Sequence, residues 1–223
     1  MRTKTLLAAA TMLAAGLASS LAQSNVYSLN VVGYVNRVIP GTGKYSMLAN
    51  PLNSTSNTLG GLLTAALPAG SQVLVFNPAI VDYDTYTRVV FGNGWSPAAG
   101  ATVDLSPGKG VLIHAAAAAG DVTNTFVGEV MQGSLSHPIA AGYTFLGNKV
   151  PESGDATTIG LTTSTANGTQ LGRMDVAAQD FTVSTRVAFG SFWSPSVPTI
   201  NVADGFYINS VAATNWVRNF TVQ

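Results

Sequence analysis

The stretch from Gly70 to Pro97, GSQVLVFNPAIVDYDTYTRVVFGNGWSP, decides the fold because it recurs at residues 168–195 as GTQLGRMDVAAQDFTVSTRVAFGSFWSP. The two segments align without a gap at an offset of 98 and share 12 of 28 residues. Unrelated segments of ordinary composition would share about two. The same offset pairs Tyr45, Leu48 and Asn50 with Tyr143, Leu146 and Asn148. The chain of 223 residues therefore contains two diverged copies of one module of roughly a hundred residues.

The local patterns in both copies favour β-strands. From Tyr27 to Val35 apolar residues alternate with polar ones, which is the period of a half-buried strand. Further short runs are rich in β-branched and aromatic residues and are bounded by turn-forming Gly, Pro, Asn and Asp. These runs are Val73–Phe76, Tyr83–Phe91, Val111–Ile113 and Phe126–Val130.

One segment of the first copy has helical spacing instead. Its apolar residues are Leu59, Leu62, Leu63 and Ala66, with Asn57 or Thr58 as N-cap and Pro68 as the stop. The predicted fold is therefore all-β, with two tandem, similar modules and one short helix in the first. Each module is expected to be a small β-barrel or β-sandwich, and strand spacing does not decide between the two.

The first residues predict export. Arg2 and Lys4 precede an apolar stretch from Leu6 to Ala18, and Ser20-Leu21-Ala22 supplies small residues at the cleavage positions. The apolar stretch is too short for a stable membrane anchor. We therefore expect a signal peptide over residues 1–22, no membrane span after its removal, and a location in the periplasm, at the cell surface or outside the cell.

The remaining chain is predicted to hold one copy over residues 23–126 and the other over 127–223. The segment Val122–Val130 ends the first copy and begins the second without a linker. Modules that share or adjoin a strand should be rigidly coupled rather than tethered.

Charge limits the partners. Without residues 1–22 the chain has eight Lys and Arg against ten Asp and Glu, and no basic cluster. Nucleic acid is therefore not an expected partner. Charged residues make up 9% of the chain, against roughly 25% in an ordinary soluble domain. A surface this poor in charge suits a protein that packs against copies of itself or against a surface polysaccharide.

The sequence offers few groups for catalysis. It contains no cysteine, and His114 and His137 are its two histidines, neither in a metal-ligand spacing. Asp82-Tyr83-Asp84 alternates carboxylates but lacks the remaining ligands of a calcium loop. We therefore predict no metal, no cofactor and no enzymatic activity.

One aromatic and charged constellation occurs in both copies, as Asp82, Tyr83, Arg88 and Trp95 and again as Asp180, Phe181, Arg186 and Trp193. In one interpretation the indole is a platform for a sugar ring, while Arg and Asp bond its hydroxyls. In the other, favoured interpretation, Trp95 and Trp193, together with Phe91 and Phe189, are core anchors and the charged residues brace turns.

Four short motifs are rich in glycine, proline, asparagine and aromatic residues: the segments 43–52, Asn93–Pro97, Pro107–Gly110 and Trp216–Phe220. Together they resemble a group of uncharacterised exported bacterial β-rich proteins with tandem duplicated modules. The resemblance implies export and a β-rich fold, and it implies no activity.

The leading hypothesis is a non-enzymatic structural or surface protein of the cell envelope or matrix. In one variant it self-assembles through its two ends, Val26–Val35 and Trp216–Val222, by strand addition. The alternative is a polysaccharide-binding protein with two equivalent sites around Trp95 and Trp193.

Overall fold

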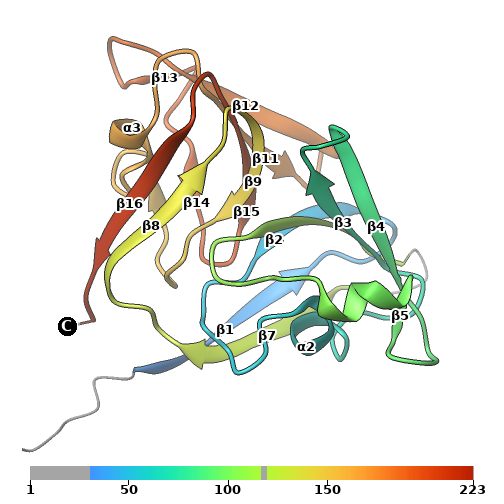
Figure 1. Ribbon diagram of the computed structural model, residues 1–223. Coiled ribbons are helices and arrows are strands. Elements are labelled where there is room, and N and C mark those ends of the chain that lie inside the picture. Colours follow the sequence, from blue (N-terminus) through green and yellow to red (C-terminus); the bar gives the residue numbers. More distant parts are fainter. Residues whose placement is uncertain (1–30, 117–119, 223) are drawn as a thin grey trace, which may run out of the picture. The chain divides into compact units, whose positions relative to one another are not determined.

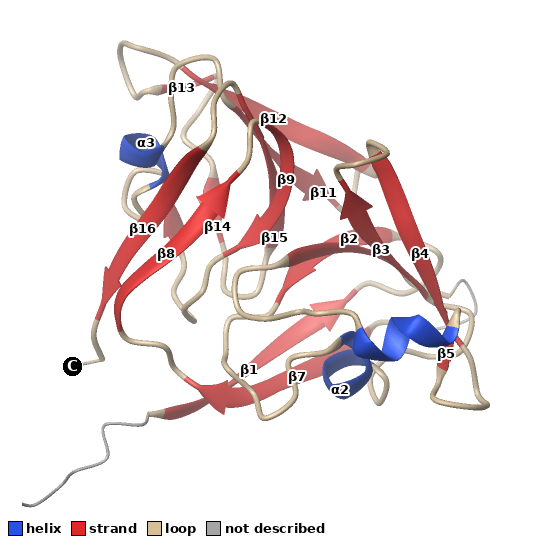
Figure 2. Ribbon diagram, in the orientation of Figure 1, coloured by secondary structure: helices blue, strands red, loops and turns tan. Residues whose placement is uncertain are grey.

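A computed structural model describes residues 31–116 and 120–222. The predicted signal peptide and the predicted strand residues before Val31 lie outside this part of the chain. Contacts gather Val31–Gln223 into one compact unit. The unit is built from β-strands with short helical turns (Figure 2), which confirms the predicted fold class.

The first copy consists of a five-stranded antiparallel sheet and a two-stranded ribbon. The sheet has the order β2-β6-β3-β4-β5, and β1 pairs with β7 along its whole length (Figure 1). Its elements are β1 (Val32–Ile39), β2 (Tyr45–Ala49), α2 (Leu59–Leu63), β3 (Gln72–Asn77), β4 (Asp82–Arg88), β5 (Trp95–Ser96), the 3₁₀ turn η1 (Ala98–Thr102), β6 (Gly110–His114) and β7 (Val122–Glu129).

The second copy repeats this topology strand for strand. Its sheet has the order β13-β12-β11-β15-β9, and β16 pairs with β8 in the ribbon. The elements are β8 (Gly133–Ile139), β9 (Gly142–Gly147), α3 (Leu161–Ser164), β11 (Gln170–Asp175), β12 (Asp180–Arg186), β13 (Trp193–Ser194), β15 (Gly205–Ser210) and β16 (Thr214–Phe220), with a further short pair of β10 (Gly154–Asp155) and β14 (Thr199–Ile200). Neither five-stranded sheet closes into a barrel within the described residues.

The predicted helix forms as α2, and its capping follows the sequence. The Thr58 hydroxyl accepts a hydrogen bond from the Gly61 amide, while Leu59 and Leu63 are buried. The second copy also has a single helical turn, α3, which was not predicted. Its residues Leu-Thr-Thr-Ser carry no helical periodicity, and it begins after a left-handed Gly160 rather than a side-chain cap.

Each copy has its own hydrophobic core. Leu59, Leu63, Val73 and Trp95 belong to the first core. Leu161, Leu171, Trp193 and Phe206 belong to the second. Alternate residues such as Val111 and Ile113 of β6 belong to these cores. In β2 and β6 the residues between them are buried as well, because these strands also contact the other copy.

The two copies contact each other through equivalent residues in both directions. Leu48 bridges Asp204, and its counterpart Leu146 bridges Lys109, the counterpart of Asp204. The amide of Ala49 donates to the carbonyl of Ala203 at 3.0 Å, and that of Gly147 donates to the carbonyl of Gly108 at 2.9 Å. Such reciprocal contacts define a pseudo-two-fold relation, like the interface of a symmetric homodimer.

Glycines make this close approach of the copies geometrically feasible. A Cβ on Gly110 would lie 2.5 Å from the carbonyl oxygen of Leu146, and one on Gly205 would lie 2.8 Å from that of Leu48. A Cβ on Gly147 would lie 1.9 Å from the Ala49 Cβ. Backbone therefore packs on backbone where the copies meet.

The strand β7 pairs with β1 of its own copy over its full length, and the predicted boundary at residues 126/127 falls inside it. The strand contacts between the copies join β2 and β6 of the first sheet to β9, β11 and β15 of the second.

Candidate functional site

The two repeated tryptophans lie in the cores. Trp95 is 3% exposed and Trp193 is 2% exposed. The indole N–H of Trp95 donates to the Thr64 hydroxyl at 2.7 Å, and that of Trp193 donates to the Thr162 hydroxyl at 2.8 Å. Neither indole offers a face to a sugar, so the structure gives no support to two equivalent tryptophan platforms.

The two repeated arginines hold the loop that follows β4 or β12. Arg88 Nε donates to the carbonyl of Thr64 at 2.9 Å, and Nη1 donates to the carbonyls of Val89 and Gly94. The equivalent bonds of Arg186 go to the carbonyls of Thr162, Val187 and Phe192. These donors are directed at backbone oxygens, which agrees with the predicted bracing role.

The repeated phenylalanines differ from the tryptophans. Phe91 is 72% exposed and Phe189 is 86% exposed. They lie in the loops that the arginines hold, between β4 and β5 and between β12 and β13. The interpretation of these two side chains as core anchors is therefore wrong, because the turn before each tryptophan projects them into solvent. We call the loops Val89–Gly94 and Val187–Phe192 the hairpin tips.

The repeated aspartates stand at the start of β4 and β12. The carboxylate of Asp82 accepts a hydrogen bond from the amide of Tyr83 at 2.8 Å, and that of Asp180 accepts one from Phe181 at 2.7 Å. Both carboxylates are exposed. The side chains that follow them, Tyr83 and Phe181, enter a cluster of aromatic rings between the two copies.

This cluster, which we call the aromatic cleft, contains six aromatic rings, and each ring contacts at least one other. The rings of Phe76 and Phe145 stack with centroids 5.1 Å apart, and Tyr83 meets Phe145 edge-on at 5.6 Å. Tyr207 lies 6.0 Å from Phe145, 5.5 Å from Tyr143 and 5.1 Å from Phe181. Phe76 and Tyr83 come from the first copy and the other four rings from the second.

Strand pairing explains how these rings come together. Phe76 faces Tyr83 across β3 and β4, and Phe145 faces Tyr207 across β9 and β15. Residues directly opposite each other in a sheet place their side chains on the same face. Gly172 lies opposite Tyr207 on β11, and a Cβ there would lie 2.1 Å from the Tyr207 ring. The missing side chain leaves room for Tyr207 to extend toward Phe181.

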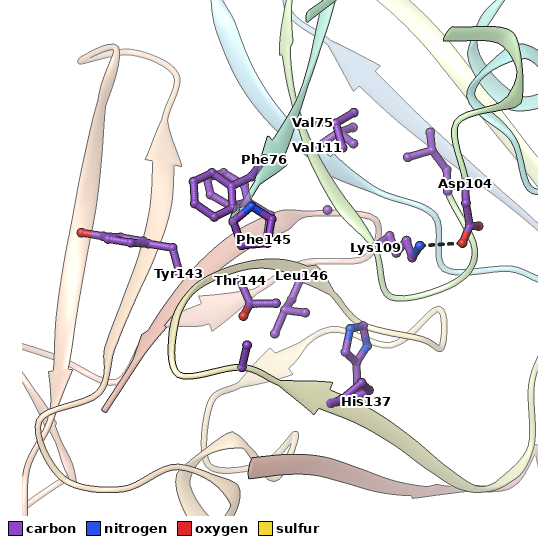
Figure 3. A pocket seen from close by; sticks show the side chains of 15 residues that line it. Val75, Phe76, Asp104, Lys109, Val111, His137, Tyr143, Thr144, Phe145 and Leu146 are labelled. Carbon is purple, nitrogen blue, oxygen red and sulfur yellow. Dashed lines mark hydrogen bonds and ion pairs between the residues drawn. The ribbon is translucent and has the colours of Figure 1, made fainter. Parts of the chain in front are cut away.

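Two adjoining cavities lie along these rings. The outer one, of about 300 Å³, is lined by all six aromatic residues and Val81. The inner one, of about 340 Å³, shares Phe76, Tyr143 and Phe145 with it. Figure 3 shows Phe76 and Phe145 close together in the lining of the inner cavity, with Tyr143 on one side of them and His137 on the other.

The inner cavity contains polar atoms that the chain does not satisfy. His137 is 9% exposed, and its Nδ1 has no hydrogen-bond partner in the described part of the chain. The hydroxyl of Thr144 is likewise buried and unpaired there. Burial, followed by the positive charges of Lys149 and Lys109, lowers the pKa of His137 to about 4. The imidazole is therefore neutral at pH 7 and carries one donor and one acceptor nitrogen.

The phenol groups of the outer cavity influence each other. Burial, then the charge of Asp82 and the neighbouring Tyr143, raises the pKa of Tyr83. Burial, then Tyr143, Tyr83 and Asp180, raises the pKa of Tyr207. Both hydroxyls thus stay protonated at neutral pH and can donate or accept hydrogen bonds.

The pseudo-two-fold relation places an equivalent crevice on the other side of the contact between the copies, and its lining differs. Met47 and Met174 stand there in place of Phe145 and Phe76, and Arg37 stands in place of His137. Arg37 pairs with Asp204 at 2.7 Å. This crevice, of about 230 Å³, is thus polar and lacks the aromatic lining.

The prediction from sequence missed Phe76, His137, Tyr143, Phe145 and Tyr207. It found Tyr83 and Phe181 because they recur, but the residues that distinguish the cleft are those that differ between the copies. A usable signal was present in the aligned positions, where Met47, Leu112 and Met174 match Phe145, Tyr207 and Phe76.

Comparison with protein-family models, with curated proteins and with solved structures found no match. Within residues 31–116 and 120–222, no three His, Cys, Asp or Glu side chains are placed to hold a metal ion. No helix in the same ranges has the length and apolar character needed to cross a membrane.

Proposed function

We propose that this chain is a non-enzymatic, exported structural protein of the cell envelope or matrix, and that it self-associates through its hairpin tips. The observation that carries the proposal is the exposure of Phe91 and Phe189 at the same place in both copies. One exposed apolar side chain needs no explanation. Two at equivalent positions, beside the exposed Val90 of the first tip, form a repeated apolar feature on a chain poor in charge.

The tips are held in place, which favours a binding role. Besides the bonds from Arg88, the amide of Val89 donates to the carbonyl of Gly94 at 2.9 Å, and the amide of Gly94 donates to that of Phe91 at 3.1 Å. The second tip has the same pair of bonds between Val187, Phe189 and Phe192. A loop fixed before binding loses less conformational entropy when it docks.

The position of the tips suits assembly into chains. They adjoin β5 and β13, the outermost strands of the two sheets, and the strands at the opposite edges, β2 and β9, take part in the contact between the copies (Figure 1). One molecule can therefore contact two neighbours, and a contact that does not close on itself extends indefinitely.

The strand-addition variant would use the second edges of β1 and β16, since each of their ribbons has two strands. The described part of the N-terminal segment already pairs within the chain, as Val35 does with Phe126, and Trp216 pairs with His137. Each of these strands has one partner in its own ribbon.

The test is sedimentation velocity over a range of protein concentrations. We expect the wild-type protein to form concentration-dependent oligomers and the double variant Phe91→Ser/Phe189→Ser to sediment as a monomer. Tyr34→Ser is the matched control, since Tyr34 is also 72% exposed but lies on β1 away from the tips. A wild-type protein that stays monomeric at the highest concentration, or oligomers that survive the double substitution, would refute the proposal.

A further inference from the structure

We propose that the aromatic cleft between the copies binds one uncharged sugar ring of a polysaccharide, with the ring stacked on aromatic side chains and its hydroxyls bonded to His137 and Thr144. This site differs from the predicted tryptophan sites, and it does not depend on self-association through the hairpin tips.

The first argument is the shape and lining of the two cavities. Their volumes of about 300 and 340 Å³ lie at the lower end of the range of roughly 300–1,000 Å³ that small-molecule sites occupy. The side chains of Phe76, Phe145 and Tyr143 line both cavities. A sugar ring has two flat faces with C–H groups, and such faces pack well on aromatic rings.

The second argument is the pair of unsatisfied polar atoms. His137 Nδ1 and the Thr144 hydroxyl are buried and have no partner in the described residues. An aliphatic or aromatic hydrocarbon would leave both unpaired, which is unfavourable for buried polar groups. A ring that carries hydroxyls on its edge would supply a donor or an acceptor to each.

The third argument is the charge of the lining. The outer cavity is lined by no ionised side chain. In the inner cavity, the ammonium of Lys109 is paired with the carboxylate of Asp104 at 2.5 Å (Figure 3), and the imidazole of His137 is neutral at pH 7. Among the residues that line the two cavities, no charge is therefore left unpaired to hold an acidic or basic ligand.

The fourth argument explains why there is one such site. The equivalent crevice has methionines in place of two of the rings, and an Arg37–Asp204 ion pair where the cleft has His137 and Lys109. The duplication supplies two similar crevices, and the stacking surface is found in one of them.

The test uses the full chain and isothermal titration calorimetry with dextran, xylan, galactomannan and mixed-linkage β-glucan as neutral polysaccharides, and alginate as an acidic one. We expect at least one neutral polysaccharide to bind and alginate not to bind. Tyr143→Ala and Phe145→Ala should each weaken that binding at least about tenfold. Thr144→Val, which keeps the shape but removes the hydroxyl, should also weaken it.

The chain supplies its own control. Tyr45 is the counterpart of Tyr143 in the other copy, so Tyr45→Ala should leave the affinity within about twofold of the wild type. If Phe145→Ala unfolds the protein, Tyr143→Ala still tests the stacking surface, because Tyr143 is 41% exposed, and it should weaken binding while preserving the melting temperature.

Three outcomes would overturn the inference: no binding of any neutral polysaccharide, preferential binding of alginate, or an equal loss of affinity in Tyr45→Ala and Tyr143→Ala. None of them bears on the sedimentation result for the hairpin tips, so the two proposals can fail separately.

Discussion

The buried imidazole of His137 should make the protein sensitive to acid. Its pKa in the folded chain is about 4, below the value of roughly 6.5 for an exposed histidine. Between these values the unfolded chain binds a proton that the folded chain does not, so the free energy of unfolding falls as the pH decreases from 6.5 to 4. The full loss attributable to this residue is on the order of 3 kcal/mol.

Urea unfolding at pH 7 and at pH 4 measures this effect. The free energy of unfolding should change between the two pH values by about 3 kcal/mol less in His137→Gln than in the wild type. An unchanged pH dependence in His137→Gln would show that this imidazole does not titrate as its surroundings imply.

Single residues also show where inference from sequence ends. The burial of Trp95 and the bracing role of Arg88 were both expected, because large aromatics serve cores and a repeated charge serves a turn. Phe91 could not be separated from Trp95 by residue type. Its exposure results from the tight turn between β4 and β5, and the tertiary path of a loop is not encoded in periodicity.

Among the elements, the contact between β2 and β9 can be tested with one pair of residues. Gly147→Ala would place a Cβ 1.9 Å from that of Ala49, and we expect it to lower the free energy of unfolding by about 1–3 kcal/mol. The exchange Ala49→Gly/Gly147→Ala moves the methyl group to the other side of the pseudo-two-fold contact. It should restore the stability to within about 1 kcal/mol, the remainder reflecting the flexibility of the new glycine.

Chemical denaturation of the wild type, both single variants and the double variant completes the cycle. Gly120→Ala, in open space before β7 and without a positive φ, controls for the loss of a glycine. Additive effects of the two substitutions would mean that these strands do not touch as described.

The strands and α2 could be predicted because their signals are local: alternation, turn residues and a threonine cap. The aromatic cleft could not, since its rings come from five strands, β3, β4, β9, β12 and β15, that lie far apart in the sequence. Recurrence drew attention to residues that both copies need for folding. The cleft depends instead on divergence, and it depends on how the copies face each other, which one copy alone does not reveal.

At the scale of the whole molecule, the reciprocal contact implies different behaviour for the two copies when separated. In a homodimer of residues 131–223, Gly147 would face Gly147, and Asp204 would face His137, the counterpart of Arg37. In a homodimer of residues 31–130, Ala49 would collide with Ala49, and Arg37 would face Lys109. We therefore expect the second copy alone to dimerise and the first copy alone to remain monomeric.

Sedimentation equilibrium of the two fragments measures this, after circular dichroism has shown that each retains its β-structure. Gly147→Ala in the second fragment should abolish its dimer, because two alanines would then meet where a Cβ on Gly147 would already lie 1.9 Å from that of Ala49 in the intact chain. If the first fragment dimerised and the second remained monomeric, the residues that face each other in the fragments would not be those expected of a symmetric dimer.

The fusion of the two modules has a genetic consequence. In a dimer of identical chains, a single codon change appears at both symmetric crevices, so neither can gain a trait that harms the other. Here the codons for Phe145 and Met47 are separate, and selection can act on each alone. Such a chain can keep a structural ion pair in one crevice while substitutions change the lining of the other. A homodimer of the ancestral module could not change one crevice alone.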